Sequence, residues 1–373
     1  MIQRIKSQFY YFSNLSEIEH RNFGLDVMRG IGLLMVLIGH SLHFFEPFYP
    51  KIYRISHFVI NGVELFFALS GFLIGRIIIK TFIQNGSYTL KTFAGFIKRR
   101  WYKTLPVYYL AIFINYIIGH FITGTSFDFN WKYLLFIHTF FESSHTFFPI
   151  SYSLAMEEWF YLLFPLFFLA SIWLFKKREP YLILVGLCIA YIILSVTMRM
   201  QIYLTDHPHW DTVMRKSLLT RIDCSIYGVL MALFFYKSKE WFIKYRNWLL
   251  ILGLLLYAIS IYFRILYPEG FYYNVLYFTF IPFAFAVSIP FFYCIKRGSY
   301  FVFTLFTFLS LTAFAFYLFH LSPIMEVFLM FTKDRTLPFT LLAYAIYLIV
   351  TFSTTSLWYR YVEKPITELR DNF

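Results

Sequence analysis

Long apolar runs recur along the whole chain, and they constrain its fold more than any other feature. The runs 249–261 and 341–352 do not alternate between apolar and polar residues, whereas the strands of a transmembrane β-barrel do so over about ten residues. The runs therefore predict helices, and a helix that crosses a bilayer needs about 20 mostly apolar residues. Segments of this kind are expected at 25–46, 57–79, 103–122, 150–175, 181–200, 219–236, 248–266, 272–295, 301–331 and 338–360. The ninth is too long for a simple crossing, and Pro323 predicts a break within it.

The charged residues are too few to cover a surface that faces water. They make up 14% of the 373 residues, and hydrophobic residues make up 59%, against about 25% and 45–50% in soluble domains. We therefore predict an all-α polytopic transmembrane helical bundle of about ten spans, surrounded by membrane lipids. The net charge of +13 does not indicate nucleic-acid binding, because the Lys and Arg residues gather between the spans. No metal site is expected, since no metal-ligand spacing is found among the cysteines Cys188, Cys224 and Cys294.

Basic residues gather in alternate connections between the expected spans. They are Lys91, Lys98, Arg99, Arg100 and Lys103, then Lys176, Lys177 and Arg178, and then Lys237, Lys239, Lys244 and Arg246. Such connections face the cytoplasm, so an even number of spans places both termini in the cytoplasm. The protein is expected to lie in the cytoplasmic membrane. The opposite connections 123–149 and 201–217 are rich in aromatic residues and poor in Lys. They are too short for a folded outer domain, and residues 1–373 are expected to form one membrane domain.

The first span carries ionisable residues that call for an explanation, because each costs at least about 2.5–3.5 kcal/mol at the bilayer centre. Arg29 and His40 are eleven residues apart, which places them on one helix face about 16 Å from each other. Asp26 and His43 extend this polar stripe by one turn at either end. The alternative is that Arg29 reaches back to the membrane interface and His40 bonds a neighbouring helix.

Other spans add further polar groups. These are Ser70 and Arg76 in the second span, Glu157 at the outer end of the fourth, Asp223 in the sixth and His320 in the ninth. Structural alternatives stay open for several of them. Asp223 and the nearby Arg221 could form an ion pair, His320 could be a packing residue, and the basic tract 98–103 could serve only to orient the chain.

Several stretches of the chain resemble the acyltransferase-3 family of membrane O-acyltransferases. The stretch Leu25–His40 is similar to the family's opening and meets its Arg-x10-His signature with Arg29 and His40. Six further stretches follow in the family's order, at Gly62–Ile74, Arg99–Leu110, Tyr152–Pro165, Arg221–Gly228, Phe316–Pro323 and Val362–Pro365. Two positions depart from the family pattern, which has Trp at Tyr152 and Arg at Lys103. The lysine keeps the charge but loses the two-pronged geometry of a guanidinium.

The resemblance implies transfer of an acyl group, commonly acetyl, from cytoplasmic acyl-CoA to a hydroxyl of an extracytoplasmic glycan or lipid-linked sugar. The CoA phosphates would bind Arg76, Arg99, Arg100 and Lys103 near Arg29. A sugar hydroxyl needs a base, and a neutral imidazole suits that role. We therefore expect His40 to be the general base, with Glu157 orienting it or binding the acceptor. Acyl-CoA would be a co-substrate, and no bound cofactor is expected.

Three questions stay open at the level of sequence. Transfer could be direct, or it could pass through a covalent acyl intermediate on His40 or Ser70. The group that stabilises the negative charge on the thioester oxygen is not identified. The competing function is a glycan exporter or flippase that uses the polar stripe as its path, although no inverted repeat is found.

Overall fold

The computed structural model describes residues 21–124, 128–140, 147–206, 209–296 and 298–371. The expected connections 123–149 and 201–217 therefore lie partly outside the described residues. Every regular element in the described ranges is a helix or a helical turn. The α-helices are α2 (Phe23–Phe45), α3 (Ser56–Val59), α4 (Gly62–Ile78), α5 (Leu90–Ile118), α6 (Ser151–Leu174), α7 (Pro180–Asp206), α8 (Ile226–Lys237), α9 (Lys239–Leu266), α10 (Tyr277–Tyr293), α11 (Tyr300–Phe319), α12 (Glu326–Thr332), α13 (Leu337–Trp358) and α14 (Lys364–Asp371).

Short turns of 3₁₀- or π-helix extend or join these helices. They are η2 (Pro50–Ile55), η3 (Ile79–Gln84), η4 (Gly119–Thr123), η6 (Trp131–Tyr133), η7 (Trp210–Arg215), η8 (Leu219–Arg221), η9 (Tyr272–Leu276), η10 (His320–Met325) and η11 (Tyr359–Glu363). Ten stretches of the described chain are long and apolar enough to cross a membrane. Each coincides with one of the ten predicted spans, so the predicted bundle is confirmed.

The third span begins earlier than predicted. Helix α5 begins at Leu90, where the Thr89 side chain accepts a hydrogen bond from the Thr92 backbone N–H. It continues through the basic tract 98–103 because Lys and Arg are good helix formers. Hydropathy detects only the part of a helix that lies in lipid, so the predicted span did not include the polar first turns of α5.

The break predicted at Pro323 is confirmed. Helix α11 ends at Phe319, and the turn η10 follows it with non-helical dihedral angles at Ser322 (φ −113°, ψ 123°). Proline has no N–H and its ring crowds the preceding turn, so a regular helix cannot pass through it undisturbed. The chain resumes as α12, and His320 lies directly at the break.

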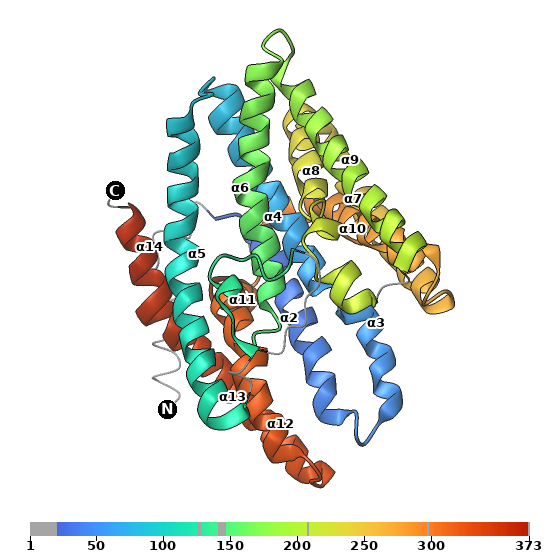
Figure 1. Ribbon diagram of the computed structural model, residues 1–373, viewed down its shortest axis with the longest axis vertical. Coiled ribbons are helices and arrows are strands. Elements are labelled where there is room, and N and C mark those ends of the chain that lie inside the picture. Colours follow the sequence, from blue (N-terminus) through green and yellow to red (C-terminus); the bar gives the residue numbers. More distant parts are fainter. Residues whose placement is uncertain (1–20, 125–127, 141–146, 207–208, 297, 372–373) are drawn as a thin grey trace.

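Five helices, α2, α4, α8, α10 and α11, form the centre of the bundle. In the most apolar 18-residue segment of the stretch that includes α4, 67% of the residues are buried. In the corresponding segment of the stretch that includes α8, 72% are buried. Helices α7 and α9 present far more of their surface outward, with 17% and 22% buried. Figure 1 shows α5 and α6 running side by side, with α14 alongside α5. The ionisable residues of the first two spans are therefore carried by central helices.

Helices α4 and α8 cross in direct backbone contact through two glycines. A Cβ atom on Gly71 would lie 1.8 Å from the carbonyl oxygen of Ser225, and one on Gly228 would lie 2.0 Å from that of Ala68. Small residues of this kind let helices approach closely in lipid, where packing contacts drive association. The contact fixes α4, and with it Ser70, against the start of α8.

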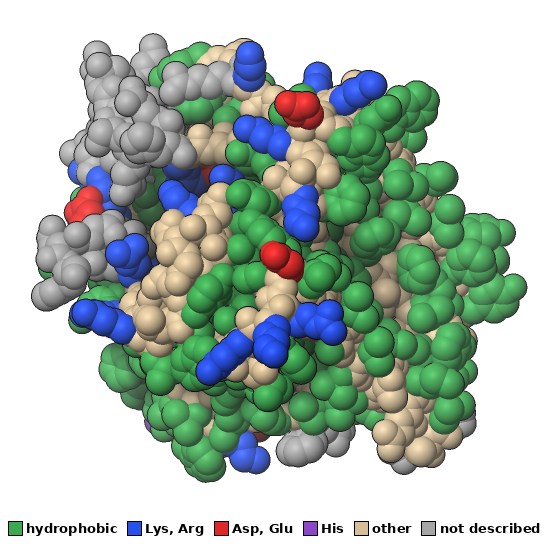
Figure 2. All heavy atoms as spheres, turned by 90° about the horizontal axis from the view of Figure 1, so that it is seen from above, with side chains coloured by type: hydrophobic (Ala, Val, Ile, Leu, Met, Phe, Trp, Pro, Cys, Tyr) green, Lys and Arg blue, Asp and Glu red, His purple; other side chains and the backbone are tan. Residues whose placement is uncertain are grey.

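Lys and Arg side chains gather at one end of the bundle. Figure 2 views this end, where basic side chains predominate over acidic ones. Here α6 joins α7 through 175–179 and α8 joins α9 at Ser238. We call it the basic end. Because successive spans alternate in direction, α2 runs from the basic end at Phe23 to the opposite end at Phe45.

A fully buried ion pair ties three helical elements together. The Arg199 guanidinium donates two parallel hydrogen bonds of 3.0 Å to the Asp223 carboxylate, and both side chains are inaccessible to solvent. Arg199 also donates to the carbonyl oxygens of Val275 (2.9 Å) and Thr220 (2.8 Å) and to the Thr279 hydroxyl (2.8 Å). The pair therefore holds α7, the start of α8 and α10 in register.

Replacing Asp223 by Ala is expected to destabilise the protein by about 3–5 kcal/mol, because it leaves Arg199 charged and buried without its counterion. The double variant Arg199→Met, Asp223→Leu should recover much of this loss. Thermal melting in detergent measures the effect, with Arg178→Met, a change at an exposed arginine, as control. A single variant that melts like the wild type would contradict the structural role.

His138 packs inside the connection between α5 and α6. Its Nε2 lies 2.8 Å from the Ser151 hydroxyl, and that hydroxyl donates to the Phe148 carbonyl at 2.7 Å. The His138 Nε2–H is therefore the donor to Ser151. Burial disfavours the charged ring and lowers the pKa of His138 to about 4.

A His pKa that is lower in the folded state makes stability fall as the pH falls. The contribution is full above the unfolded value of about 6.5 and is lost between there and pH 4, up to about 3 kcal/mol. Between pH 7.5 and pH 5, we expect the melting temperature of the wild type to drop more than that of His138→Gln. Equal drops in the two proteins would show that His138 does not contribute.

Candidate active site

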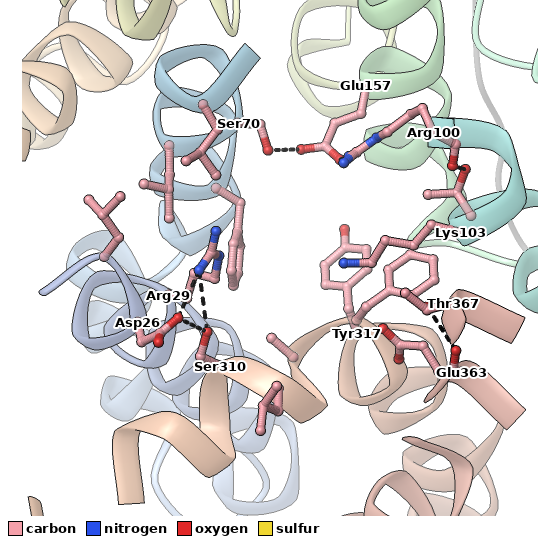
Figure 3. A pocket seen from close by; sticks show the side chains of 18 of the residues that line it. Asp26, Arg29, Ser70, Arg100, Lys103, Glu157, Ser310, Tyr317, Glu363 and Thr367 are labelled. Atoms are coloured by element: carbon pink, nitrogen blue, oxygen red, sulfur yellow. Dashed lines mark hydrogen bonds and ion pairs between the residues drawn. The ribbon is translucent and has the colours of Figure 1, made fainter. Parts of the chain in front are cut away.

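A cavity of about 610 Å³ opens between α2, α4, α5, α6, α11 and the C-terminal segment. Figure 3 shows its two walls, with Arg29, Ser70 and Ser310 on one side and Lys103 and Glu363 on the other. We call it the basic cavity. Its charged lining residues are Arg21, Asp26, Arg29, Arg76, Arg100, Lys103, Glu157, Glu158, Glu363, Lys364 and Glu368.

One carboxylate serves two arginines on the α2 wall of the basic cavity. Asp26 is buried and accepts hydrogen bonds from Arg21 (2.7 Å), Arg29 (2.9 Å) and the Ser310 hydroxyl (2.6 Å). Two arginines thus share the single carboxylate of Asp26. The side chain of Arg29 is still 26% exposed. The guanidinium is therefore held in place while it stays accessible to an anion.

The facing wall holds Arg100 beside Glu157. The Arg100 guanidinium donates to the Tyr161 hydroxyl at 2.6 Å and lies over the Tyr161 ring at 3.9 Å from its centroid. The Glu157 carboxylate lies 3.8 Å from Arg100 and accepts a 2.7 Å hydrogen bond from Ser70. Lys103, one helical turn beyond Arg100 on α5, lines the same wall near Glu363 (Figure 3). Arg29 on α2 and Arg100 and Lys103 on α5 thus line one space from facing walls.

His40 and His320 form a direct pair near the other end of α2. His40 Nδ1 lies 2.8 Å from His320 Nε2, and the two rings stack with centroids 5.0 Å apart. His320 is fully buried, whereas His40 is half-buried. The Phe316 ring stacks on His320 at 4.8 Å, and the Tyr347 hydroxyl donates to the His320 carbonyl. His320 is thus fixed, and His40 is the more accessible ring.

The contacts of His320 determine which nitrogen of His40 is basic. His320 Nδ1 faces the carbonyl oxygens of Phe316 (2.9 Å) and Tyr317 (3.1 Å). Carbonyls only accept, so His320 Nδ1 carries a proton, and Nε2 of the neutral ring is an acceptor. His40 Nδ1 then donates to His320, and the lone pair of neutral His40 lies on its Nε2. This arrangement prepares His40 Nε2 to take a proton.

Tyr317 belongs to both the basic cavity and the histidine pair. It lines the cavity, and its ring centroid lies 6.0 Å from that of His320. Its hydroxyl is 2.6 Å from the Ser153 hydroxyl and donates to the Ile150 carbonyl at the start of α6. The cavity therefore extends from Arg29 on α2 to Tyr317 on α11, the tyrosine that adjoins the histidine pair.

The structure brings most of the predicted site residues together. Seven line the basic cavity: Asp26, Arg29, Ser70, Arg76, Arg100, Lys103 and Glu157. Five do not. His40 and His320 form their own pair outside the cavity lining. Arg99 is exposed and lies outside the cavity lining, His43 is exposed beside Glu46, and Asp223 is buried in the pair with Arg199.

Two predicted partnerships differ from those in the structure. Glu157 was expected to orient His40 or to bind the acceptor. In the structure its hydrogen-bond partner is Ser70 and the partner of His40 is His320, so the first alternative is not seen and the second stays a prediction. The alternative that Arg221 pairs with Asp223 is wrong. Arg221 donates a 2.6 Å hydrogen bond to Glu64, while Asp223 is bound by Arg199. Arg221 and Asp223 lie two positions apart in the chain, but they bind side chains of two different helices, α4 and α7.

Ser310, Tyr317 and Glu363 line the cavity and were not predicted, and neither was Arg199, which forms the structural pair with Asp223. Arg199 lies inside an apolar span, and the cost of a buried charge could have identified it. Glu363 lies in the closing Val362–Pro365 stretch. Ser310 and Tyr317 could not be distinguished from the many other Ser and Tyr residues of the spans.

Comparison with known proteins identifies a family for the chain. The sequence model of a family described as "Acyltransferase domain" matches residues 22–359. A provisionally named peptidoglycan O-acetyltransferase of Bacillus subtilis is 29% identical over 170 residues, which are 42% of this chain and 25% of that protein. A provisionally named O-acetyltransferase of Staphylococcus aureus strain COL is 28% identical over 225 residues, 56% and 34% of the two chains.

The peptidoglycan O-acetyltransferase OatA of Listeria monocytogenes is 30% identical over 142 residues, 34% of this chain and 22% of OatA. The chain thus spans only about a quarter to a third of the length of these relatives. No solved structure gives a significant match. Because the family match extends over most of the chain, from Asn22 to Tyr359, this multi-pass membrane protein belongs to the acyltransferase family that the domain defines.

Proposed function

We propose that the protein transfers an acyl group, acetyl in the first instance, from acyl-CoA to a hydroxyl of a glycan across the membrane. The observation that carries the proposal is the position of two chemically distinct sites on α2. A basic cavity surrounds Arg29 near one end, a prepared histidine base lies near the other, and Tyr317 adjoins both. The names of the relatives suggest a glycan such as peptidoglycan as acceptor.

The basic cavity suits the phosphate groups of acyl-CoA. Arg29 and Arg100 can grip phosphate oxygens with paired N–H groups, and Lys103 adds a mobile point charge. Arg99 is exposed and does not line this space, so it is not part of the proposed donor site. Since the cavity lies toward the basic end, which faces the cytoplasm by the positive-inside rule, acyl-CoA would enter from the cytoplasm.

The chemical step needs a base at the acceptor hydroxyl. As the hydroxyl oxygen attacks the thioester carbonyl carbon, His40 Nε2 takes its proton, and His320 stabilises the resulting imidazolium through the Nδ1 hydrogen bond. The carbon–sulfur bond then breaks, and the proton passes from His40 to the departing CoA thiolate. The flexible pantetheine arm bridges the distance of about 16 Å along α2 from Arg29 to His40.

Transfer of radiolabelled acetyl from acetyl-CoA into a glycan fraction tests the function directly. The protein in nanodiscs should label the glycan, and His40→Ala should lower the rate by about a hundredfold or more. His320→Ala should lower kcat by about tenfold and shift the pH profile of the reaction, while His320→Gln, which can still accept a hydrogen bond, should recover part of the rate. An exporter would leave no acyl label on the glycan. Normal transfer by His40→Ala would overturn the role of this histidine.

Neighbouring arginines on α5 provide a matched pair for the donor site. Arg100 lines the cavity, whereas Arg99 is exposed outside it. Arg100→Gln should weaken CoA binding by about tenfold to a hundredfold, as expected for one lost charge-assisted hydrogen bond, and Arg99→Gln should change it little. Displacement of labelled CoA from the purified protein measures both. Equal weakening by the two changes would indicate a general charge effect rather than a site.

A further inference from the structure

A second cluster of charges lies near the other end of α2, in the connection between α7 and α8. Arg215 and Lys216 both bind the carboxylate of Asp211. The side chains of Arg215 and Lys216 are only 20% and 14% exposed, and that of Asp211 is 33% exposed. We call these three residues the outer cation cluster. It plays no part in the donor site.

The outer cation cluster sits on a well-anchored segment. The Arg215 carbonyl accepts a hydrogen bond from Arg221, which is itself bound to Glu64 on α4. The backbone N–H of Leu218 donates to the Thr139 carbonyl at 2.6 Å. The cations are thus presented from a fixed backbone rather than from a mobile loop, so little conformational freedom is lost when they bind a ligand.

The cluster faces the histidine pair through Tyr152. Arg215 Nη1 donates to the Tyr152 hydroxyl at 3.3 Å, and its guanidinium lies 5.4 Å from the ring centroid. The next residue, Ser153, binds the Tyr317 hydroxyl beside His320. The start of α6 and Tyr317 thus connect the two cations to the histidine pair that holds the proposed base.

The charges of the cluster do not cancel. Two cations share the single carboxylate of Asp211, and the neighbouring Glu64 is already occupied by Arg221. Burial and the adjacent Arg215 lower the pKa of Lys216, while Asp211 raises it. Burial raises the pKa of Asp211, but Arg215 and Lys216 outweigh it and the pKa is lowered overall. Among the described residues, two cations of the cluster thus share one carboxylate.

We propose that Arg215 and Lys216 bind an anionic group of the acceptor, a carboxylate or a phosphate, and so select acidic over neutral saccharides. The inference rests on the proposed acyl transfer and names the chemical class of its acceptor. A guanidinium binds a carboxylate or a phosphate through paired hydrogen bonds, and Lys216 adds a second charge. Anchoring the anion beside Tyr152 brings a nearby hydroxyl of the same saccharide toward His40 Nε2.

Three probe saccharides with one backbone test the proposal. The first is a neutral β-1,4-linked tetrasaccharide of N-acetylglucosamine, the second carries a lactyl ether carboxylate on alternate sugars, and the third carries 6-phosphates. Binding to the full chain in nanodiscs and acetyl transfer from acetyl-CoA are both measured. We expect at least one acidic probe to bind about tenfold more tightly than the neutral one, and the preferred probe identifies carboxylate or phosphate as the ligand.

Arg215→Gln and Lys216→Gln should each bring the ratio of acidic to neutral binding close to one. Arg54→Gln, a change at an exposed arginine of η2, should keep the ratio. The ratio compares two ligands of the same protein sample, so partial loss of folded protein does not affect it. If neither variant can be purified, the salt dependence of wild-type binding decides, because the acidic preference should fall as the ionic strength rises.

The two proposals fail in different ways. Equal binding of acidic and neutral probes by the wild type, or an acidic preference that survives both substitutions, would overturn the anion site. Acidic preference without acetyl transfer to any probe would support the anion site and count against the acyl transfer. Transfer to all three probes at one rate and with one affinity would leave the acyl transfer in place and remove the anion site.

Discussion

The cost of placing a charge in lipid governs the arrangement of this protein. An ionised group inside the bundle must find a counterion or a set of hydrogen bonds, and the central helices are positioned accordingly. Arg199 binds Asp223, Arg221 binds Glu64, and Arg29 binds Asp26. Arg221 and Glu64 are 157 positions apart, so their pair specifies that helices distant in the chain lie next to each other, and the Arg199–Asp223 pair fixes how α7 packs against the start of α8. Hydrophobic burial alone would allow many packings of ten apolar helices.

The same requirement separates structural charges from those available for chemistry. Arg199 and Asp223 satisfy each other completely and are closed to solvent. Arg29 shares its carboxylate with Arg21 and is still a quarter exposed, and Arg215 shares its carboxylate with Lys216. A carboxylate shared by two cations, together with partial exposure, is the feature on which both proposed anion sites rest. One proposed site lies near each end of α2.

Hydropathy predicted all ten spans because lipid imposes its length and polarity on each segment separately. The stripe of Arg29 and His40 was predictable for the same reason, since helical spacing is a local property. Partners were not predictable. His320 lies 280 positions from His40, and nothing in a single helix indicates which distant side chain will face it. The start of α5 was missed because its basic turns lie outside the apolar segment that hydropathy detects.

The pairing of two histidines bears on the choice between an enzyme and a transporter. A transporter moves its substrate by alternating between packings, and its polar path needs no particular proton arrangement. His320 is held by two backbone carbonyls, a stacked Phe316 and the hydroxyl of Tyr347, so that its one remaining nitrogen is committed to His40. The histidine pair forms part of a buried polar network, and such a network is stabilising only when every group in it is satisfied. The network leaves a single basic nitrogen on His40 with a defined direction. Removal of a proton from a hydroxyl requires an oriented base of this kind, whereas movement of a substrate does not.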